Sequence, residues 1–343
     1  PEFRLIDPVE LRRVMRGDQA RANVSTVTPP ARSGSLQTMR SRSHSWVEIS
    51  RSALLANVGT LRGLCGPTAR LAPVVKANAY GHGLELCARI FASAGADMLC
   101  VNEVAEAEAI ASLGVPVYLL GPSLPEDAPR LAAAGCEVVS SSEPHVRALS
   151  AAGVACGVEV PVHLKVETGT NRQGVPADDV MRMVDLIRVS PGVRLAGVCT
   201  HLADVEDETE HTFARVQLDR FDAVTLGLGV PRHSASSAAH LLFERARMDM
   251  VRPGIASYGL WPSAETEIAA RMVHGEGAVE LTPALSWKTR VTQVKWAAVG
   301  DYVGYGRTRR LSRRTRVAIL PVGYYDGFDR QLSGRAQVSV RGQ

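Results

Sequence analysis

Short apolar segments of β character alternate with helix-periodic segments between residues 46 and 280, and this alternation limits the possible folds more than any other feature of the sequence. Strands separated by helices pair in parallel, and helices cover both faces of such a sheet. The β-type segments are Leu71–Val75, Met98–Val101, Val117–Leu120, Glu137–Val139, Val160–Val166, Leu195–Cys199, Pro231–Ser234 and Met248–Val251.

Helical periodicity fills most of the intervals between these segments. Repeated strand–helix units over about 250 residues are typical of a (β/α)₈ TIM-type barrel of the α/β class. A doubly wound open sheet is the rival arrangement, but the first strand is not followed by a GxGxxG motif. The helical segments are Leu84–Ser93, Glu103–Leu113, Glu143–Ala152, Ala177–Val189, Thr209–Leu226 and Ser237–Glu244.

The composition and the apolar pattern of the sequence change on both sides of this region. Residues 1–45 are rich in Ser, Thr and Arg, and we expect a flexible extension that derives partly from cloning. Residues 46–280 form the predicted barrel, and residues 281–343 form a predicted C-terminal all-β domain. A β domain of about 60 residues is small, so we expect it to be incomplete here. Its β-type segments are Leu285–Ala298, Tyr302–Gly304, Val317–Val322 and Ala336–Val340.

Composition excludes several classes of protein. The net charge of +4 is small for 343 residues, and no basic face interleaved with aromatic residues indicates nucleic-acid binding. The six cysteines are scattered and form no CxxC pair, which argues against a disulfide framework and a zinc site and favours a reducing cytoplasm. No apolar stretch of about 18 residues predicts a membrane span, and no apolar signal core opens the chain.

Polar and charged residues gather where the predicted strands end, which is where barrel enzymes place their catalytic groups. Each of them alone has an ordinary explanation, such as a solvated cation, a hydrogen-bonded histidine or a helix cap. Their convergence on one rim predicts an active site. The residues are Lys76, Lys165, Glu167, Arg172, His201, Ser234, Ser236, Ser237, Arg252 and Gly254.

The types of residue on this rim indicate a phosphate and a carbonyl compound. Ser236 and Ser237 offer backbone N–H groups and hydroxyls to an anion, and Gly254 allows close backbone approach. The last two strand–helix loops of a barrel are a common phosphate site. A lysine beside a phosphate site suits pyridoxal 5′-phosphate, whose aldehyde forms a Schiff base with the amine. We therefore expect this cofactor to be held by Lys76.

Seven motifs occur in order: VVKANAYGHG, KVETGTNRQG, CTHL, HSASSAA, MVRPGIASYGL, YVGYGRT and LPVGYYDGF. With these motifs the chain closely resembles bacterial alanine racemases, which are fold-type III pyridoxal-phosphate enzymes, over about residues 46–343. The resemblance implies an isomerase that interconverts L-alanine and D-alanine and supplies D-alanine for cell-wall peptidoglycan.

The resemblance also implies the cofactor contacts. Lys76 corresponds to the Schiff-base lysine. Tyr80 corresponds to a tyrosine that helps to hold the phosphate, and Ser237, Gly254 and Ile255 correspond to the rest of the phosphate cradle.

Five further residues correspond to positions around the cofactor ring and the substrate. Arg172 matches the arginine that contacts the cofactor's phenolic oxygen and the substrate carboxylate. Arg252 matches the arginine that faces the ring nitrogen. His201 matches the histidine that links this arginine to the catalytic tyrosine, and Tyr305 matches that tyrosine. Tyr324 matches a tyrosine at the substrate entrance.

Racemisation in this family uses two bases, one on each face of the substrate. The resemblance assigns Lys76 to one face and Tyr305 to the other. The tyrosine comes from the β domain of the second subunit, so the resemblance implies a homodimer with shared active sites.

The sequence departs from the family pattern at two positions and leaves two questions open. Glu167 stands in place of an aspartate, and Thr170 stands in place of an apolar residue expected to pack beneath the cofactor. Lys165 matches a lysine that is carbamylated in some members, and a plain structural lysine is the alternative. We expect His82 to make only a structural hydrogen bond in its loop.

Two other functions remain open at this stage. One is racemisation of another amino acid, such as serine, lysine or arginine, because those racemases share most of the motifs. The other is a catalytically weak pyridoxal-phosphate-binding protein, since such proteins consist of the barrel alone and an incomplete β domain would leave a similar molecule.

Overall fold

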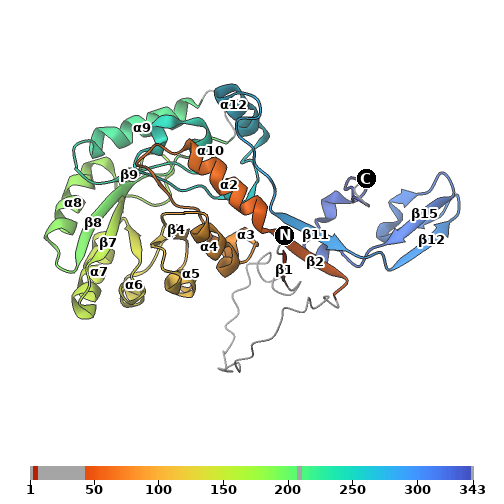
Figure 1. The fold of residues 1–343 in the computed structure, drawn as a ribbon, viewed down its shortest axis with the longest axis horizontal. Helices are drawn as coiled ribbons and strands as arrows, with labels where there is room; N and C mark the ends of the chain where they lie inside the picture. The colour runs from red at the N-terminus through yellow and green to blue at the C-terminus, as the bar shows by residue number, and fades with distance from the viewer. Residues whose placement is uncertain (1–2, 7–42, 207–210, 341–343) are drawn as a thin grey trace. The chain divides into compact units, whose positions relative to one another are not determined.

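The computed structural model describes residues 3–6, 43–206 and 211–340, and its contacts divide the chain into two compact units (Figure 1). Residues 50–284 form the first, which we call the barrel unit. The described residues before 50 join residues 285–340 in the second, which we call the β unit. Of the predicted extension 1–45, residues 3–6 form a strand, while 1–2 and 7–42 lie outside the described residues.

Parallel strands close into a barrel in the first unit. β4 to β9 form one sheet in chain order, and β10 pairs in parallel with β3. A bridge between Val74 and Cys100 joins the β3 segment to β4. The N–H of Asp249 donates to the carbonyl of Arg232 at 3.0 Å, which joins β10 to β9. The predicted (β/α)₈ barrel is therefore confirmed. Its strands are β3 (Arg70–Leu71), β4 (Leu99–Val101), β5 (Val117–Leu119), β6 (Glu137–Ser140), β7 (Val160–Lys165), β8 (Val193–Cys199), β9 (Arg232–His233) and β10 (Met250–Val251).

Helices lie outside these strands, as Figure 1 shows for α5 to α9. Helix α8 illustrates why, because its buried residues Val180, Met183, Val184 and Ile187 recur with the period of one helical face. The helices are α2 (Arg51–Leu64), α3 (Lys76–Tyr80), α4 (Leu84–Ser93), α5 (Val104–Ile110), α6 (Ala128–Ala134), α7 (Glu143–Cys156), α8 (Val180–Val189), α9 (Thr212–Thr225), α10 (Ser237–Leu242), α11 (Glu244–Arg247) and α12 (Ala264–His274), with 3₁₀ turns η1 (Ala111–Leu113), η2 (Pro125–Asp127), η3 (Ala177–Asp179) and η4 (Ile255–Tyr258).

The predicted helix Thr209–Leu226 begins at Thr212 in the structure, and residues 207–210 lie outside the described residues. The barrel interior is filled by a cluster of buried side chains that includes Val74, Cys100 and Tyr118. These buried side chains fill the barrel beneath the strand ends.

The β unit contains antiparallel strands. β2 (Ser45–Ser50) pairs with β11 (Leu285–Thr289), with Ile49 opposite Leu285. Residues 46–49 were predicted within the barrel range but contribute to this sheet. The remaining elements are β1 (Phe3–Ile6), β12 (Gln293–Ala297), β13 (Tyr302–Val303), β14 (Arg309–Arg310), β15 (Thr315–Ile319) and the 3₁₀ turns η5 (Tyr305–Arg307), η6 (Tyr324–Asp326) and η7 (Arg330–Leu332).

The predicted strand Ala336–Val340 is wrong, because these residues form no regular element. A strand needs a neighbour for its backbone hydrogen bonds. No strand pairs with this segment among the described residues, and Val338 and Val340 remain exposed.

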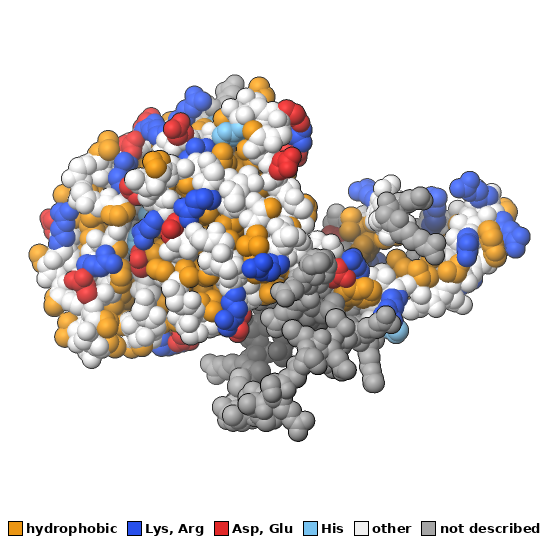
Figure 2. Space-filling model, in the orientation of Figure 1, with side chains coloured by type: hydrophobic (Ala, Val, Ile, Leu, Met, Phe, Trp, Pro, Cys, Tyr) orange, Lys and Arg blue, Asp and Glu red, His pale blue; other side chains and the backbone are white. Residues whose placement is uncertain are grey.

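Charged side chains of both signs are interspersed over the face of the barrel unit seen in Figure 2. Many form surface ion pairs, such as Arg130 with Glu108 and Arg147 with Glu143. In the β unit, Arg314 lies 4.7 Å from the centre of the Trp296 ring. Within the described residues, none of the helices has the length and apolar character that crossing a membrane requires.

Candidate active site

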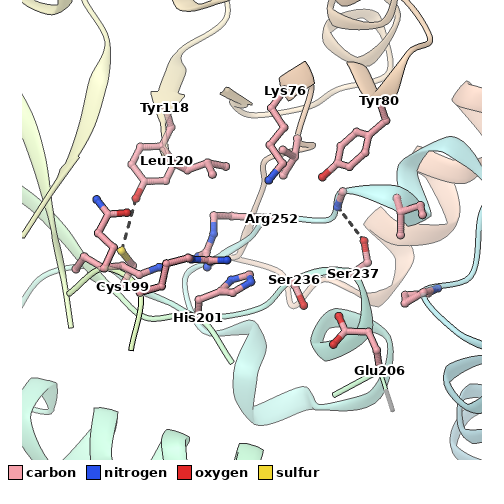
Figure 3. Close-up of a pocket in the computed structure, with 17 residues that line it drawn as sticks. Lys76, Tyr80, Tyr118, Leu120, Cys199, His201, Glu206, Ser236, Ser237 and Arg252 are labelled. Carbon is pink, nitrogen blue, oxygen red and sulfur yellow. Dashed lines mark hydrogen bonds between the residues drawn. The ribbon is translucent and has the colours of Figure 1, made fainter. Parts of the chain in front are cut away.

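A cavity of about 380 Å³ opens where the barrel strands end, and many of the predicted site residues line it (Figure 3). It lies entirely in the barrel unit. The predicted residues that line it are Lys76, Tyr80, Lys165, Arg172, His201, Ser236, Ser237, Arg252, Gly254 and Ile255.

Lys76 begins a left-handed turn. Ala77, Asn78, Ala79 and Tyr80 all have φ between 51° and 54°, a region that residues with a Cβ rarely occupy. The turn is held by the N–H of Ala79, which donates to the carbonyl of Val75 at 2.8 Å, and by Oδ1 of Asn78, which accepts from the N–H of Leu84 at 2.7 Å. This backbone places both Lys76 and Tyr80 at the cavity, as Figure 3 shows.

Ser237, Gly254 and Tyr80 form one side of the cavity. Oγ of Ser237 accepts hydrogen bonds from the N–H of Gly254 at 2.8 Å and of Ala256 at 3.2 Å, which ties together the loops after β9 and β10. A Cβ on Gly254 would lie 2.5 Å from the hydroxyl of Tyr80. Glycine is therefore needed here for Tyr80 to reach the cavity.

The cavity has an excess of positive charge. Lys76, Lys165, Arg172 and Arg252 line it, whereas Glu206 is the only carboxylate among the described lining residues. Such a lining favours an anionic ligand.

In these surroundings the pKa values of three titratable groups of the site are lowered, so their uncharged forms are more populated than usual. Burial lowers the pKa of Lys76, and the charge of Arg172 lowers it further. Burial lowers the pKa of Lys165 to about 8. Burial, followed by the charges of Lys165 and Arg252, lowers the pKa of His201 to about 3, so His201 is neutral at physiological pH.

Arg252 is buried at the centre of the site, with 7% of its surface exposed. Its guanidinium donates to Nδ1 of His233 and to the carbonyl oxygens of Thr200 at 3.0 Å and Ser234 at 3.3 Å. Figure 3 shows His201 close beneath it. These hydrogen bonds orient the guanidinium without neutralising it.

The loop that carries Arg172 is organised by the departure at Glu167. Its carboxylate accepts the N–H of Gly169 at 2.5 Å, and hydrogen bonds from the backbone of Asn171 and Arg172 help to lower its pKa against the opposing effect of burial. The hydroxyl of Thr170 donates to the same carboxylate at 3.3 Å. The two departures therefore interact, and Thr170 is not among the residues that line the cavity.

Tyr305 and Tyr324 lie in the β unit and do not line this cavity. Tyr305 begins η5, and its side chain is 94% exposed, while that of Tyr324 is 65% exposed. The cavity of the barrel unit thus contains the predicted cofactor contacts but not Tyr305 or Tyr324.

Sequence reasoning missed part of the lining. Tyr118 on β5, Leu120 directly after β5 and Cys199 at the end of β8 line the cavity (Figure 3). The alternation of side chains along a strand would have identified Tyr118 and Leu120, which are two residues apart.

Two parts of the chain match the two domains of one protein family. Residues 49–262 match "Alanine racemase, N-terminal domain", and residues 284–343 match "Alanine racemase, C-terminal domain". An alanine racemase from Leptospira interrogans serovar Lai is 35% identical over 318 residues, which cover 89% of this chain and 80% of that protein. One from Symbiobacterium thermophilum is 38% identical over 306 residues, 87% of this chain and 78% of that protein.

Solved structures give the same result. Alanine racemase from D-cycloserine-producing Streptomyces lavendulae superposes with a TM-score of 0.78 at 31% identity, covering 89% of this chain and 80% of that one. Alanine racemase from Bacillus anthracis with bound L-Ala-P superposes with a TM-score of 0.74 at 29% identity, covering 85% and 76%. The fold, the cationic cavity at the strand ends and these matches together show that the chain belongs to the alanine racemase family.

Proposed function

We propose that this protein interconverts L-alanine and D-alanine with pyridoxal 5′-phosphate bound in the cavity of the barrel unit. The observation that carries the proposal is the meeting of a half-buried lysine of lowered pKa with three further cationic side chains in that cavity. A cofactor with a phosphate and a substrate with a carboxylate both need positive charge.

The residues present fit this cofactor. Ser237, Gly254, Ile255 and Tyr80 would hold the phosphate, because they bring hydroxyls and an unobstructed backbone to one side of the cavity. Arg252 would face the ring nitrogen, and Lys76 would bond to the aldehyde carbon. When bound, the cofactor withdraws electrons from the substrate Cα and so makes its proton removable.

Lys76 is well suited to moving that proton. A lysine must be neutral to accept a proton at Nζ, and its lowered pKa increases the neutral fraction. Arg172 would bind the substrate carboxylate through its two N–H edges. Glu167 holds the backbone of the Arg172 loop and so fixes the place of that contact.

Arg252 favours racemisation over other reactions of the same cofactor. A guanidinium only donates hydrogen bonds and stays protonated, so it would leave the ring nitrogen without a proton. Electron withdrawal by a ring held in this way would be weaker, which would favour return of the proton to Cα.

We further propose that Tyr305 is the second base, supplied by the β unit of another copy in a homodimer with shared sites. Its hydroxyl is available, because the side chain is almost fully exposed within its own unit. Tyr324 would lie at the substrate entrance. The reference pKa of tyrosine is about 10, so Tyr305 needs nearby positive charge to act as a base.

All six cysteines are free, which supports a reducing compartment, the cytoplasm, where the D-alanine would enter peptidoglycan synthesis.

Lys165, with a pKa of about 8, has an appreciable neutral fraction, which is the form that reacts with carbon dioxide to give a carbamate. A carbamate there would be an anion that could orient Arg172.

The test is loss of optical activity. Circular dichroism of an L-alanine solution should decay to zero with the protein and pyridoxal phosphate, and Lys76→Ala should abolish the decay together with the cofactor's visible absorption band. Serine, lysine and arginine are measured in parallel. An unchanged alanine signal contradicts the proposal, and faster racemisation of another amino acid changes the substrate.

A further inference from the structure

A chain of buried polar side chains crosses the barrel interior from β6 to the loop after β10. Nε2 of His163 lies 2.6 Å from Oε2 of Glu137, and Nδ1 of His163 lies 2.9 Å from Nε2 of His233. Nδ1 of His233 contacts the guanidinium of Arg252. Both histidines have no exposed surface. Three strands and one loop thus contribute to a single line of hydrogen bonds.

The two ends of the chain determine where its protons lie. A guanidinium can only donate, so Nδ1 of His233 must accept and its proton must be on Nε2. Nδ1 of His163 accepts that proton's hydrogen bond, so His163 also carries its proton on Nε2. The carboxylate of Glu137 can only accept, and it receives this last N–H. Every group is satisfied in one arrangement, and both histidines are neutral.

The titration behaviour of the three groups agrees with this arrangement. Burial lowers the pKa of His163 and of His233, and the charge of Arg252 contributes further at His233. Burial alone would raise the pKa of Glu137, but the hydrogen bond from His163 and the charge of Arg70 outweigh it, so its pKa falls. Glu137 is therefore the ionised end of the chain.

Arg252 needs a compensating negative charge, because burying an unpaired charge is costly. Among the described residues, no carboxylate forms a direct ion pair with it. Of the charged side chains that line the cavity with it, Lys76, Lys165 and Arg172 have the same sign, and Glu206 is the only carboxylate among the described lining residues. Glu137 is the anion that its hydrogen bonds reach, through two polarised imidazoles.

We propose that Glu137, His163 and His233 are positioning residues that stabilise and orient the Arg252 guanidinium, with Glu137 as its remote counter-charge. The inference rests on the proposed function in assigning Arg252 to the cofactor's ring nitrogen. The chain itself is a property of the protein without cofactor. Its failure and the failure of the proposed racemisation can therefore be told apart.

The decisive variant is Glu137→Gln, whose amide oxygen still accepts from His163 but carries no charge. Magic-angle-spinning NMR of the ¹⁵N-histidine-labelled apoprotein should show both wild-type imidazoles neutral and protonated on Nε2. In the variant the Nε2–H proton signal of His163 should move to higher field. That of His233, which is one hydrogen bond further from residue 137, should move in the same direction. An imidazolium, or a proton on Nδ1 at either position, overturns the proposal.

The loaded enzyme provides a second measurement. Glu137→Gln should weaken cofactor binding and lower kcat, each about tenfold, and leave the KM for alanine within about twofold. Arg70→Gln is the matched control, because Arg70 lies 3.7 Å from Glu137 yet its removal keeps the carboxylate. It should leave both quantities close to wild type. Equal losses in the two variants would mean that the ion pair, and not the chain, is important.

A double-variant test separates a relay from separate structural effects. His163→Asn can still accept from His233 but is too short to reach Glu137. In that background Glu137→Gln should have little further effect on cofactor affinity, because the connection is already broken. Additive losses overturn the proposal. If Glu137→Gln fails to fold, Glu137→Asp and the wild-type NMR assignment keep the test decisive.

Discussion

The Nδ1 atom of His82 lies 3.1 Å from the carbonyl oxygen of Tyr80 and 3.1 Å from that of Ala79. His82 is buried, so its Nδ1–H holds the left-handed turn that begins at Lys76 from the inside. Its ring also packs 4.5 Å from the ring of Tyr258, whose hydroxyl donates to the carbonyl of Val74 at 2.8 Å. A residue predicted to make only a structural hydrogen bond therefore supports the site's lysine.

His82→Leu should release this turn. The variant loses a buried donor shared by two carbonyls. The carbonyl of Ala79 keeps the backbone N–H of residue 82 as a donor at 3.0 Å, whereas that of Tyr80 loses its bond from Nδ1. We expect about a tenfold loss of cofactor affinity and a lower thermal unfolding midpoint, measured by fluorescence titration and calorimetry. His82→Asn keeps a donor near the Nδ1 position and should recover most of the loss. Wild-type affinity in His82→Leu would show that the turn does not need the histidine.

Gly254→Ala should weaken phosphate binding through Tyr80. The added Cβ would lie 2.5 Å from the Tyr80 hydroxyl, so we expect a steric conflict between the two. We expect cofactor affinity to fall by about tenfold or more. In a Tyr80→Phe background the hydroxyl is gone, and the same substitution should cost much less. Equal costs in both backgrounds would contradict this explanation.

Acid should destabilise the barrel unit partly through His240. Burial lowers the pKa of His240 from 6.5 to about 4, so between these values the unfolded chain binds a proton that the folded chain does not. The free energy of unfolding therefore falls as the pH falls through this window, by at most about 1.4 kcal/mol per pH unit for one group.

His240→Gln keeps a donor for the carbonyl of Leu61 but does not titrate. Its urea midpoint should decline less than that of the wild type between pH 7 and pH 5. His274→Gln, which likewise alters a histidine bonded to a backbone carbonyl, is the control. Parallel declines in wild type and His240→Gln would exclude His240 as a contributor.

Tyr305→Phe should separate the two proposed bases. Removing the hydroxyl should slow exchange of the α-hydrogen of L-alanine with deuterated solvent by about 10²-fold or more, with little change in substrate binding. Exchange from D-alanine, which we expect Lys76 to catalyse, should be affected much less. Tyr302→Phe, in the same unit, is the control. Equal loss from both enantiomers would contradict the assignment.

Much of the barrel was predictable because a buried parallel strand needs a continuous apolar segment and must be followed by a polar loop. Leu84–Ser93 was predicted with the bounds of α4, and the strand ends brought Lys76, Lys165 and Arg252 to one rim. These features depend on local periodicity and on a rule common to all barrels.

Other features depend on partners far away in the sequence. Ser45–Ser50 pairs with Leu285–Thr289, and nothing in either segment specifies the other. The same applies to Glu137, His163 and His233, whose meeting requires three different strands in register. The left-handed turn was also unpredictable, because its four residues with positive φ include no glycine.

That turn has a stereochemical consequence. At Ala77, φ is 51° and ψ is 51°, the backbone geometry that is relaxed for a D-amino acid and costs an L-residue about 1–2 kcal/mol. The residue next to the lysine in this alanine racemase family member is thus an L-alanine in the conformation of its mirror image. A semisynthetic protein with D-alanine at position 77 would have less backbone strain beside the lysine than the natural chain.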